Sequence, residues 1–324
     1  MAKRSGFKNW KIAAWPRYGE TNPRNTYMYD YLEALNVRVI DLKNRPLEWI
    51  FADAVHVHWP ENAFVKNRRA VIFLLFLVLI KVTRKNIIWT VHNDPAATLK
   101  KQRSLYAFRF FVRSVDLFLL PSSLSLKILK QYRPIESLRW ALLPLGLYPK
   151  MYGTVGSKDS NGVEEGRHYH LIPGRLTKKK AIIETVTSLC QKWPEEMFFV
   201  AGQPEDEKMR LALNKLNSEY KNLKVELRFL SEERIAELIL GAQSVILNYP
   251  SGNINSGIAT LAGTYATPLF VKSKPMRRDL LRLYKIKANP LCKFPSCEKY
   301  EANNLDIEKV AKRYLKIMER RLEH

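Results

Sequence analysis

Residues 171–181 read LIPGRLTKKKA, an apolar run that stops at Pro173-Gly174-Arg175 and leads into a lysine run. The apolar run predicts a strand buried on both faces, as in parallel sheets. Gly174 lets the backbone approach a ligand closely. Arg175 can grip a phosphate with two hydrogen bonds, and Lys180 adds a charge at a helix start. The stretch therefore predicts a diphosphate site, with an ordinary turn carrying solvated basic residues as the alternative.

The same strand–helix alternation extends along the chain in both directions from this stretch. Apolar or alternating runs predict strands, and runs with helical spacing predict the helices between them. The predicted strands are 11–15, 37–42, 54–58, 86–92, 117–121, 168–173, 197–201, 225–230, 244–247 and 268–271. The predicted helices are 25–35, 99–113, 124–131, 181–192, 207–216, 232–240, 256–264 and 306–322. This alternation is typical of α/β proteins with doubly wound parallel sheets.

A polar stretch rich in Gly and Ser at 151–166 divides the chain and predicts a linker. We therefore expect two Rossmann-like domains, at 1–150 and 167–303. The helix expected within 304–324 is a candidate to pack back on the N-terminal domain. Open α/β sheets bind ligands at the carboxyl ends of their strands, so the two sheets are expected to face a cleft.

A second candidate phosphate site follows the strand predicted at 244–247. Residues 248–257 read NYPSGNINSG, with Asn255, Ser256 and Gly257 just before a helix start. Free amides at a helix start suit a pyrophosphate or sugar hydroxyls. A helix cap made by Asn or Ser is the alternative interpretation, although the loop is longer than a cap needs. Gly202, at the end of the strand predicted at 197–201, is a weaker candidate for the same site.

Two strand ends in the N-terminal half carry titratable side chains. Residues 90–94 read TVHND and residues 56–61 read HVHWPE. A general base has to reach an acceptor hydroxyl, and strand ends face the expected cleft. His92 and Asp94 are the candidates, with Glu61 as the alternative base. Asp94 also fits a turn before Pro95, and His56 and His58 alternate toward one face without completing a metal site.

Positive charge is concentrated in the N-terminal half. Residues 1–150 hold 25 Lys and Arg against 10 Asp and Glu, whereas residues 151–324 hold 29 against 21. Such a surface attracts nucleic acid or an anionic membrane face. The apolar run 70–80, AVIFLLFLVLI, is too short to span a bilayer, which needs about 20 residues. We expect a buried helix there, ahead of an interfacial helix supported by flanking Lys and Arg.

Several function classes lack their motifs in this sequence. There is no G-x-G-x-x-G after the first strand, no phosphate-binding P-loop, no G-x-S-x-G and no D-x-D at a strand end. The three cysteines do not have metal-ligand spacing. We therefore expect no cofactor and no metal, and a reduced cytoplasmic protein without a signal peptide.

The order of these motifs resembles that of GT-B glycosyltransferases of bacterial exopolysaccharide and surface-glycan synthesis, and most of all the xanthan-type β-mannosyltransferases. The similar segments cover nearly the whole chain. They are an NP-containing first loop, HVHWPE (56–61), TVHN (90–93), PGR with its later lysine, VAGQP (200–204) and FLSEERIAELILGAQSVILNYPSGNINSG (229–257).

The resemblance implies a GDP- or UDP-sugar donor in the C-terminal domain, with Arg175 and Lys180 on its diphosphate. It implies a lipid-linked saccharide acceptor in the N-terminal domain, at the inner face of the plasma membrane. The chain departs from the retaining GT-B pattern at Asn253 and Leu261, where a pair of glutamates is common. Ala181 also replaces a usual glycine, and Gln243 a frequent aspartate.

These observations predict a metal-independent glycosyltransferase, with mannose as one candidate sugar and an inverting mechanism favoured by the missing glutamates. Its partners would be the nucleotide sugar, the lipid-linked acceptor and an anionic membrane surface, without nucleic acid. Two other classes remain open at this stage. One is a basic nucleic-acid-binding protein, and the other is a catalytically inactive homologue that binds a glycan.

Overall fold

The computed structural model describes residues 9–16, 24–99, 101–148, 169–248, 256–284, 286–294 and 307–322. The chain divides into two compact units. Unit 1 comprises residues 1–146 and 305–324, and unit 2 comprises residues 147–304. The predicted linker at 151–166 lies outside the described residues.

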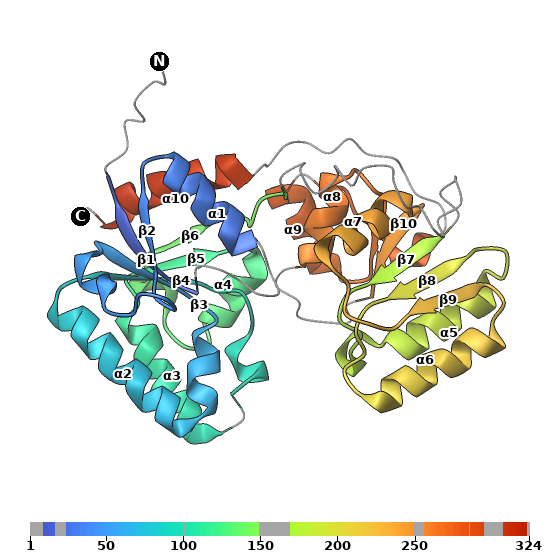
Figure 1. Ribbon diagram of the computed structural model, residues 1–324, viewed down its shortest axis with the longest axis horizontal. Coiled ribbons are helices and arrows are strands. Elements are labelled where there is room, and N and C mark those ends of the chain that lie inside the picture. Colours follow the sequence, from blue (N-terminus) through green and yellow to red (C-terminus); the bar gives the residue numbers. More distant parts are fainter. Residues whose placement is uncertain are drawn as a thin grey trace, which may run out of the picture. The chain divides into compact units, whose positions relative to one another are not determined.

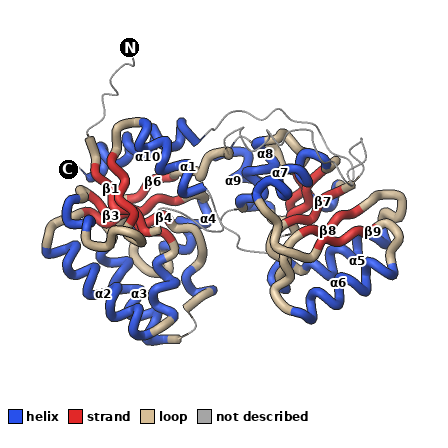
Figure 2. The backbone as a smooth tube through the Cα atoms, viewed as in Figure 1, coloured by secondary structure: helices blue, strands red, loops and turns tan. Residues whose placement is uncertain are grey.

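Unit 1 is built on a parallel six-stranded sheet in the order β2-β1-β3-β4-β5-β6. The central strands are buried on both faces because helices cover the sheet from both sides (Figures 1 and 2). The strands are β1 (Lys11–Trp15), β2 (Arg38–Asp41), β3 (Ala54–His58), β4 (Asn86–Thr90), β5 (Leu117–Leu120) and β6 (Trp140–Leu142).

The helices of unit 1 divide between the two faces of its sheet. One face packs against α1 (Arg24–Ala34) and α10 (Ile307–Leu322), and the other against α2 (Asn67–Val82) and α3 (Gln102–Ser114). The short helix α4 (Ser123–Leu129) follows β5, and its N-cap is the side chain of Ser122. The described residues of this unit also include four 3₁₀ segments: η1 (Glu48–Phe51), η2 (Pro60–Val65), η3 (Pro95–Ala97) and η4 (Ile135–Ser137).

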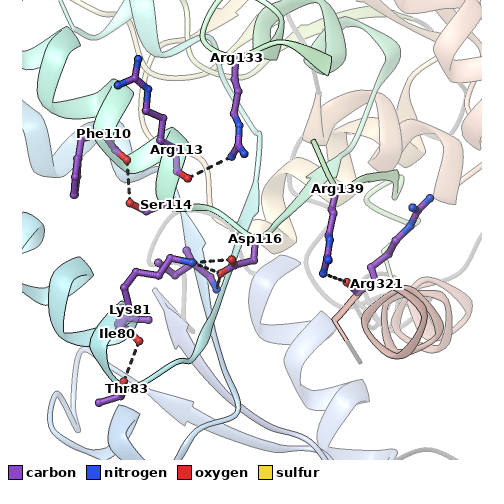
Figure 3. A network of polar contacts seen from close by, with 11 residues as sticks. Ile80, Lys81, Thr83, Phe110, Arg113, Ser114, Asp116, Arg133, Arg139 and Arg321 are labelled. Carbon is purple, nitrogen blue, oxygen red and sulfur yellow. Dashed lines mark hydrogen bonds and ion pairs between the residues drawn. The ribbon is translucent and has the colours of Figure 1, made fainter. Parts of the chain in front are cut away.

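The last described helix, α10, packs on unit 1 although it follows unit 2 in the sequence. Its buried apolar side chains repeat at helical spacing and contact α1 and the sheet. Tyr314 is fully buried among them. The guanidinium of Arg139 donates to the carbonyl of Arg321 at 3.0 Å, which ties the far end of the helix to β6 (Figure 3).

The expectation that the apolar run at 70–80 is a buried helix is wrong for half of its surface. In α2 the side chains of Phe73, Leu77 and Ile80 are buried against the sheet. Leu75 on the opposite side is 61% exposed, and its neighbours on that side are similarly exposed. No helix among the described residues is long and apolar enough to cross a membrane.

Polar contacts hold the C-terminal end of α2 against the sheet. The ammonium group of Lys81 pairs with the carboxylate of Asp116 at 2.7 Å, just before β5 (Figure 3). The same carboxylate accepts a hydrogen bond from the backbone amide of Ile87 in β4. Thr83 caps the last turn by donating to the carbonyls of Leu79 and Ile80. These contacts define the orientation of α2 on the sheet.

Unit 2 repeats the architecture with a second parallel sheet, in the order β12-β11-β10-β7-β8-β9. A core beneath α5 and α6 fills one face, and α7, α8 and α9 lie on the other (Figure 1). The strands are β7 (His170–Pro173), β8 (Phe198–Ala201), β9 (Leu223–Glu226), β10 (Ser244–Leu247), β11 (Leu269–Val271) and β12 (Asn289–Pro290). The helices are α5 (Ile182–Lys192), α6 (Glu207–Glu219), α7 (Glu232–Gly241), α8 (Gly257–Thr264) and α9 (Lys274–Tyr284).

The predicted fold class of two doubly wound parallel sheets is confirmed, with shifts at some element ends. The strand predicted at 225–230 is β9, which begins at Leu223 and ends at Glu226, whose carboxylate pairs with Arg228 and with Arg234 of α7. Strands β6 and β12 and helix α9 were not predicted; the two strands have only three and two residues, too few for a periodic pattern.

Candidate functional site

In unit 2 the two predicted phosphate motifs follow neighbouring strands. β7 and β10 pair in the sheet, and the strand order reverses between them. One motif begins at Gly174 after β7, and the other begins at Asn248 after β10. Ligands of open α/β sheets bind where the strand order reverses, at the carboxyl ends of the strands. The fold therefore brings both motifs to the position that favours ligand binding.

Two glycines make the backbone at this position very compact. Gly174 has φ +99° and Gly202 has φ +147°. A β-carbon on Gly202 would lie only 1.9 Å from the carbonyl oxygen of Gly174. The amide of Gly174 donates to the carbonyl of Ala201, so the turns after β7 and β8 pack directly on each other. Only glycine fits at position 202, and this explains the Gly that ends the VAG pattern.

The basic side chains of the first motif occupy different environments. Arg175 is exposed, whereas Lys180 is half-buried and donates from Nζ to the carbonyl of Arg175 at 2.6 Å. Burial and the charge of Arg175 lower the pKa of Lys180 to about 8. Its Nζ also lies 3.8 Å from where a β-carbon of Gly174 would be. Lys180 therefore places a titratable cation beside the glycine turn.

The alternative interpretation of the lysine run before α5 requires all its side chains to be solvated. The structure differs from this at Lys180. Lys178 pairs with Asp206 at 2.8 Å, and its amide donates to Glu205, while Lys180 turns inward. Ala181 follows with φ +48° in the left-handed region, where a β-carbon is disfavoured. This backbone conformation is the physical reason that glycine suits the position after the lysine.

The second motif places the start of α8 next to the first. A side-chain carbon of Ile258 lies 3.5 Å from where a β-carbon of Gly174 would be. Ser256 caps α8 by accepting from the amide of Ala259 at 3.2 Å, which matches the helix-cap interpretation of its hydroxyl. A β-carbon on Gly257 would lie 3.2 Å from the Tyr148 hydroxyl. Asn255 lies outside the described residues.

In unit 1 a chain of buried polar side chains runs under the carboxyl ends of β3 and β4. The hydroxyl of Tyr29 contacts Nδ1 of His56 at 2.9 Å and Nε2 of His58 at 2.7 Å. Nε2 of His56 contacts Oγ1 of Thr90 at 2.8 Å, and Nδ1 of His58 contacts Nε2 of His92 at 2.8 Å. The sequence did not predict Tyr29, because it lies on α1, far from the motifs.

Burial keeps His56 and His58 neutral. Burial lowers the pKa of His58 to about 3, and burial together with the nearby His58 and His92 lowers that of His56 well below its usual range. A neutral imidazole carries one N–H, so the donors in the chain must all run in one direction. When Nε2 of His92 donates to His58, His58 in turn donates to the hydroxyl of Tyr29. The Tyr29 hydroxyl then donates to His56, and His56 donates to Thr90. In that arrangement Nδ1 of His92 is the basic nitrogen.

The two carboxylate candidates near His92 differ in environment. Glu61 in η2 is only 3% exposed, and its pKa is raised mainly by burial and further by Asp94. Asp94 accepts from the amide of Ala96 at 3.0 Å and caps η3, so it adopts the turn role that was its alternative interpretation. Trp59, with φ +48°, stacks on the His92 ring at a centroid distance of 4.5 Å. The Asp94 carboxylate thus caps a turn, whereas Glu61 and His92 are buried just after β3 and β4.

The metal alternative for His56 and His58 meets a geometric obstacle. Both ring nitrogens of both residues lie within hydrogen-bond distance of Tyr29, Thr90 or His92. Across the described ranges, no group of three or more His, Cys, Asp or Glu side chains is arranged to hold a metal ion.

No protein-family model matches the sequence, and no curated protein matches it. Solved structures do match over nearly the whole chain. HepE from Anabaena, in complex with UDP and glucose, has a TM-score of 0.62 at 14% identity and covers 96% of this chain and 95% of its own. AviGT4, a glycosyltransferase involved in avilamycin A biosynthesis, has a TM-score of 0.60 at 12% identity, with 97% and 98% covered. Sucrose-phosphate synthase from Thermosynechococcus elongatus has a TM-score of 0.55 at 13% identity, with 95% and 94% covered.

The chain has the GT-B fold. Within that fold, the structure adds residues that the motifs did not indicate. Asn248, directly after β10, is 7% exposed and contacts the hydroxyl of Thr185 in α5. Its Oδ1 is buried without a partner in the described part of the chain. An unpaired buried acceptor at this edge of the GT-B sheet is a further candidate to contact a ligand.

Proposed function

We propose that the protein is a glycosyltransferase that moves a sugar from a nucleotide-diphosphate donor to a saccharide carried on a membrane lipid. The observation that carries the proposal is the meeting of the Gly174 turn, Lys180 and the start of α8 where the strand order of the unit 2 sheet reverses. A compact glycine backbone, two cations and helix-start amides suit a diphosphate. The solved relative HepE binds UDP and UDP-glucose, which supports a nucleotide-sugar donor here.

The proposed reaction is a single displacement at the anomeric carbon. The acceptor oxygen forms a bond to that carbon as the bond to the donor's phosphate oxygen breaks. The acceptor proton passes to Nδ1 of His92, or to Glu61 as the alternative base. The nucleotide diphosphate leaves with its charge balanced by Arg175 and Lys180. Leu261 supports inversion, because it is apolar and 4% exposed where retaining relatives carry a ribose-binding glutamate.

Finer assignments belong to the same proposal. The donor is a UDP- or GDP-sugar, with mannose the sugar suggested by the xanthan-type resemblance. The excess of Lys and Arg in residues 1–150 supports an anionic membrane surface and a phosphate-bearing acceptor. Thermal-shift measurements against UDP-glucose, UDP-galactose, GDP-mannose and the free nucleotides test the donor. A raised melting temperature with one nucleotide sugar supports the proposal, and no shift with any of them contradicts it.

Replacing Arg175 with alanine is expected to lower turnover at least about tenfold, because a charge-assisted hydrogen bond contributes about 1.5–3 kcal/mol. Steady-state kinetics with the nucleotide sugar that raises the melting temperature measure the change. Arg282→Ala is the matched control, since Arg282 is exposed in the last turn of α9 in the same unit. Equal kcat/KM for the two variants would show that Arg175 does not contact the donor.

Donor affinity is expected to fall as the pH rises through about 8. The pKa of Lys180 is lowered to about 8, so its charge is present at pH 7 and lost by pH 9.5. Loss of one charged contact to a diphosphate weakens binding by about tenfold. Isothermal titration with UDP across this pH range measures the effect. Lys180→Arg keeps its charge over this range, so UDP affinity should no longer depend on pH in that variant. If its pH dependence equals that of wild type, another group is responsible for the titration.

A further inference from the structure

The exposed side of α2 presents a continuous row of apolar side chains. Val71, Ile72, Leu75, Val78, Leu79 and Val82 are 57%, 59%, 61%, 46%, 53% and 73% exposed. Their spacing along the sequence places them on one side of a 16-residue helix about 24 Å long. We call this row the α2 face. Single exposed apolar residues are ordinary, but a row of six along a helix marks an interaction surface.

Neighbouring elements add to this apolar surface. α3 packs beside α2, and its Tyr106 and Phe110 are 59% and 48% exposed. On the other side, η1 is held to α2 by the ring of Trp49, which meets that of Phe76 edge-on at 5.5 Å. The next residues of η1, Ile50 and Phe51, are 52% and 64% exposed. Exposed apolar side chains therefore occur on all three adjacent elements.

An apolar cavity of about 400 Å³ lies beside the α2 face. Apart from Asn62 and Arg69, its lining is apolar: Trp15, Leu42, Pro46, Ala63, Ile72, Phe73 and Phe76. Ile72 belongs both to this lining and to the α2 face, so the two surfaces are continuous. The volume of the cavity falls within the range of about 300–1,000 Å³ typical of ligand pockets.

The cavity lies at the carboxyl ends of the first strands of the unit 1 sheet. Trp15 ends β1, Leu42 follows β2, and Asn62 and Ala63 lie in η2 after β3. The strand order reverses between β1 and β3. The cavity therefore lies at the carboxyl edge where the order of the unit 1 sheet reverses, which is the place where open α/β sheets bind ligands.

The charge around the α2 face identifies the kind of partner. Residues 62–115 contain 11 Lys and Arg and a single acidic residue, Asp94. Lys66, Arg68 and Arg69 are exposed at the start of α2. An apolar row with basic residues at its ends matches the surface of an anionic membrane, where side chains enter the apolar layer and cations meet phosphates. A second copy of this chain would bring two strongly basic surfaces together, which is unfavourable.

We propose that the α2 face lies in the surface of an anionic membrane and that the cavity beside it holds the apolar chain of a phosphate-bearing lipid, with Arg69 at the phosphate. Only the identification of that lipid as the carrier of the acceptor saccharide rests on the proposed function. The shared chemistry is a phosphate joined to a long apolar chain, which a membrane phospholipid or an isoprenoid carrier can supply.

Vesicle co-sedimentation of the full chain tests the α2 face. Wild type is expected to bind vesicles containing 30% phosphatidylglycerol, and Leu75→Asp should lower the bound fraction at least about tenfold. Leu211→Asp is the matched control, because Leu211 is 62% exposed on α6 in the other unit. Equal binding by the two variants overturns the proposal. So does a wild-type dimer that Leu75→Asp converts to a monomer, because the α2 face would then join two copies.

Titration calorimetry with soluble lipids tests the cavity. Farnesyl phosphate is expected to bind wild type, and inorganic phosphate is not. Asn62→Trp fills the cavity from an exposed position and leaves the α2 face intact, so it should weaken farnesyl phosphate binding at least about tenfold. Unchanged binding by Asn62→Trp overturns the cavity assignment. Tighter binding of lysophosphatidate than of farnesyl phosphate supports the cavity and assigns its lipid to the membrane rather than to an isoprenoid carrier.

The same variants separate this proposal from the proposed function. Donor binding belongs to unit 2, so Leu75→Asp and Asn62→Trp should bind UDP like wild type. Wild type that binds vesicles but no nucleotide or nucleotide sugar would contradict the transferase alone. Wild type that binds the donor but neither vesicles nor farnesyl phosphate would overturn the lipid site alone.

Discussion

Replacing Gly202 with alanine is expected to lower the free energy of unfolding of unit 2 by about 3–5 kcal/mol. The new β-carbon would lie 1.9 Å from the carbonyl oxygen of Gly174, and the backbone at φ +147° disfavours any side chain. The clash involves backbone on both sides, so no side chain can rotate away to relieve it. Hydrogen exchange of peptides from β7 and β8, measured against urea concentration, reports the loss in this unit.

Gly174→Ala separates strain from overlap at the same turn. Its φ of +99° also disfavours alanine, but a β-carbon there meets Ile258 at an ordinary contact distance of 3.5 Å. We expect a loss of only about 1–2 kcal/mol for this variant. If the two alanine variants were equally stable, the close approach of the two glycine turns would not be a feature of the folded protein. Donor binding should also weaken more in Gly202→Ala, because the displaced turn carries Arg175.

Replacing His92 with alanine is expected to lower kcat by about 100- to 10,000-fold, the usual contribution of a positioned general base. His92 follows β4, and its Nε2 is held by His58 at 2.8 Å. Donor affinity should stay near that of wild type, because the proposed donor site lies in unit 2. Pre-steady-state kinetics with a saturating donor measure the chemical step. If His92→Ala keeps the kcat of wild type, His92 is not the base. The role then falls to Glu61, and kcat of Glu61→Gln tests it.

Tyr29→Phe tests whether the buried chain positions His92. This change removes the hydroxyl that contacts both His56 and His58, so the tautomer of His92 is no longer imposed. We expect kcat to fall about tenfold at unchanged KM, with a shifted pH profile. Tyr314→Phe is the control, since it removes a hydroxyl from the same buried cluster, 3.3 Å from His56 but outside the path from His56 to His92. An identical pH profile for both variants would limit Tyr29 to a structural role.

Much of the fold was predictable because parallel strands buried on both faces appear as short apolar runs. The bounds predicted for β1, β3 and β10 match the structure at both ends. The two residues of β12 carry too little pattern to predict. The apolar run in α2 has a strong pattern, but it led to the wrong expectation of a fully buried helix. Burial and membrane contact both require apolar residues, and the sequence does not show which side of a helix the sheet covers.

The candidate site divides in the same way. Gly174, Arg175 and Lys180 could be predicted as candidates from the sequence because they lie close together in the chain. Tyr29 and Asn248 were not, since a tyrosine in a helix and an asparagine in a loop are ordinary until the fold places them. Tyr29 acquires its role only where α1 packs over β3 and meets two histidines. Asn248 acquires its role only beside α5.

The sequence by itself determined the α/β alternation, the two parallel sheets and the glycine and basic residues of the LIPGRLTKKKA stretch, because these depend on local periodicity and local chemistry. The tertiary structure alone decided three further features. It packed Gly202 onto Gly174, joined His56 and His58 through Tyr29, and left half of α2 uncovered beside an apolar cavity. Each depends on contacts between segments far apart in the chain, where packing rather than local pattern sets which atoms meet.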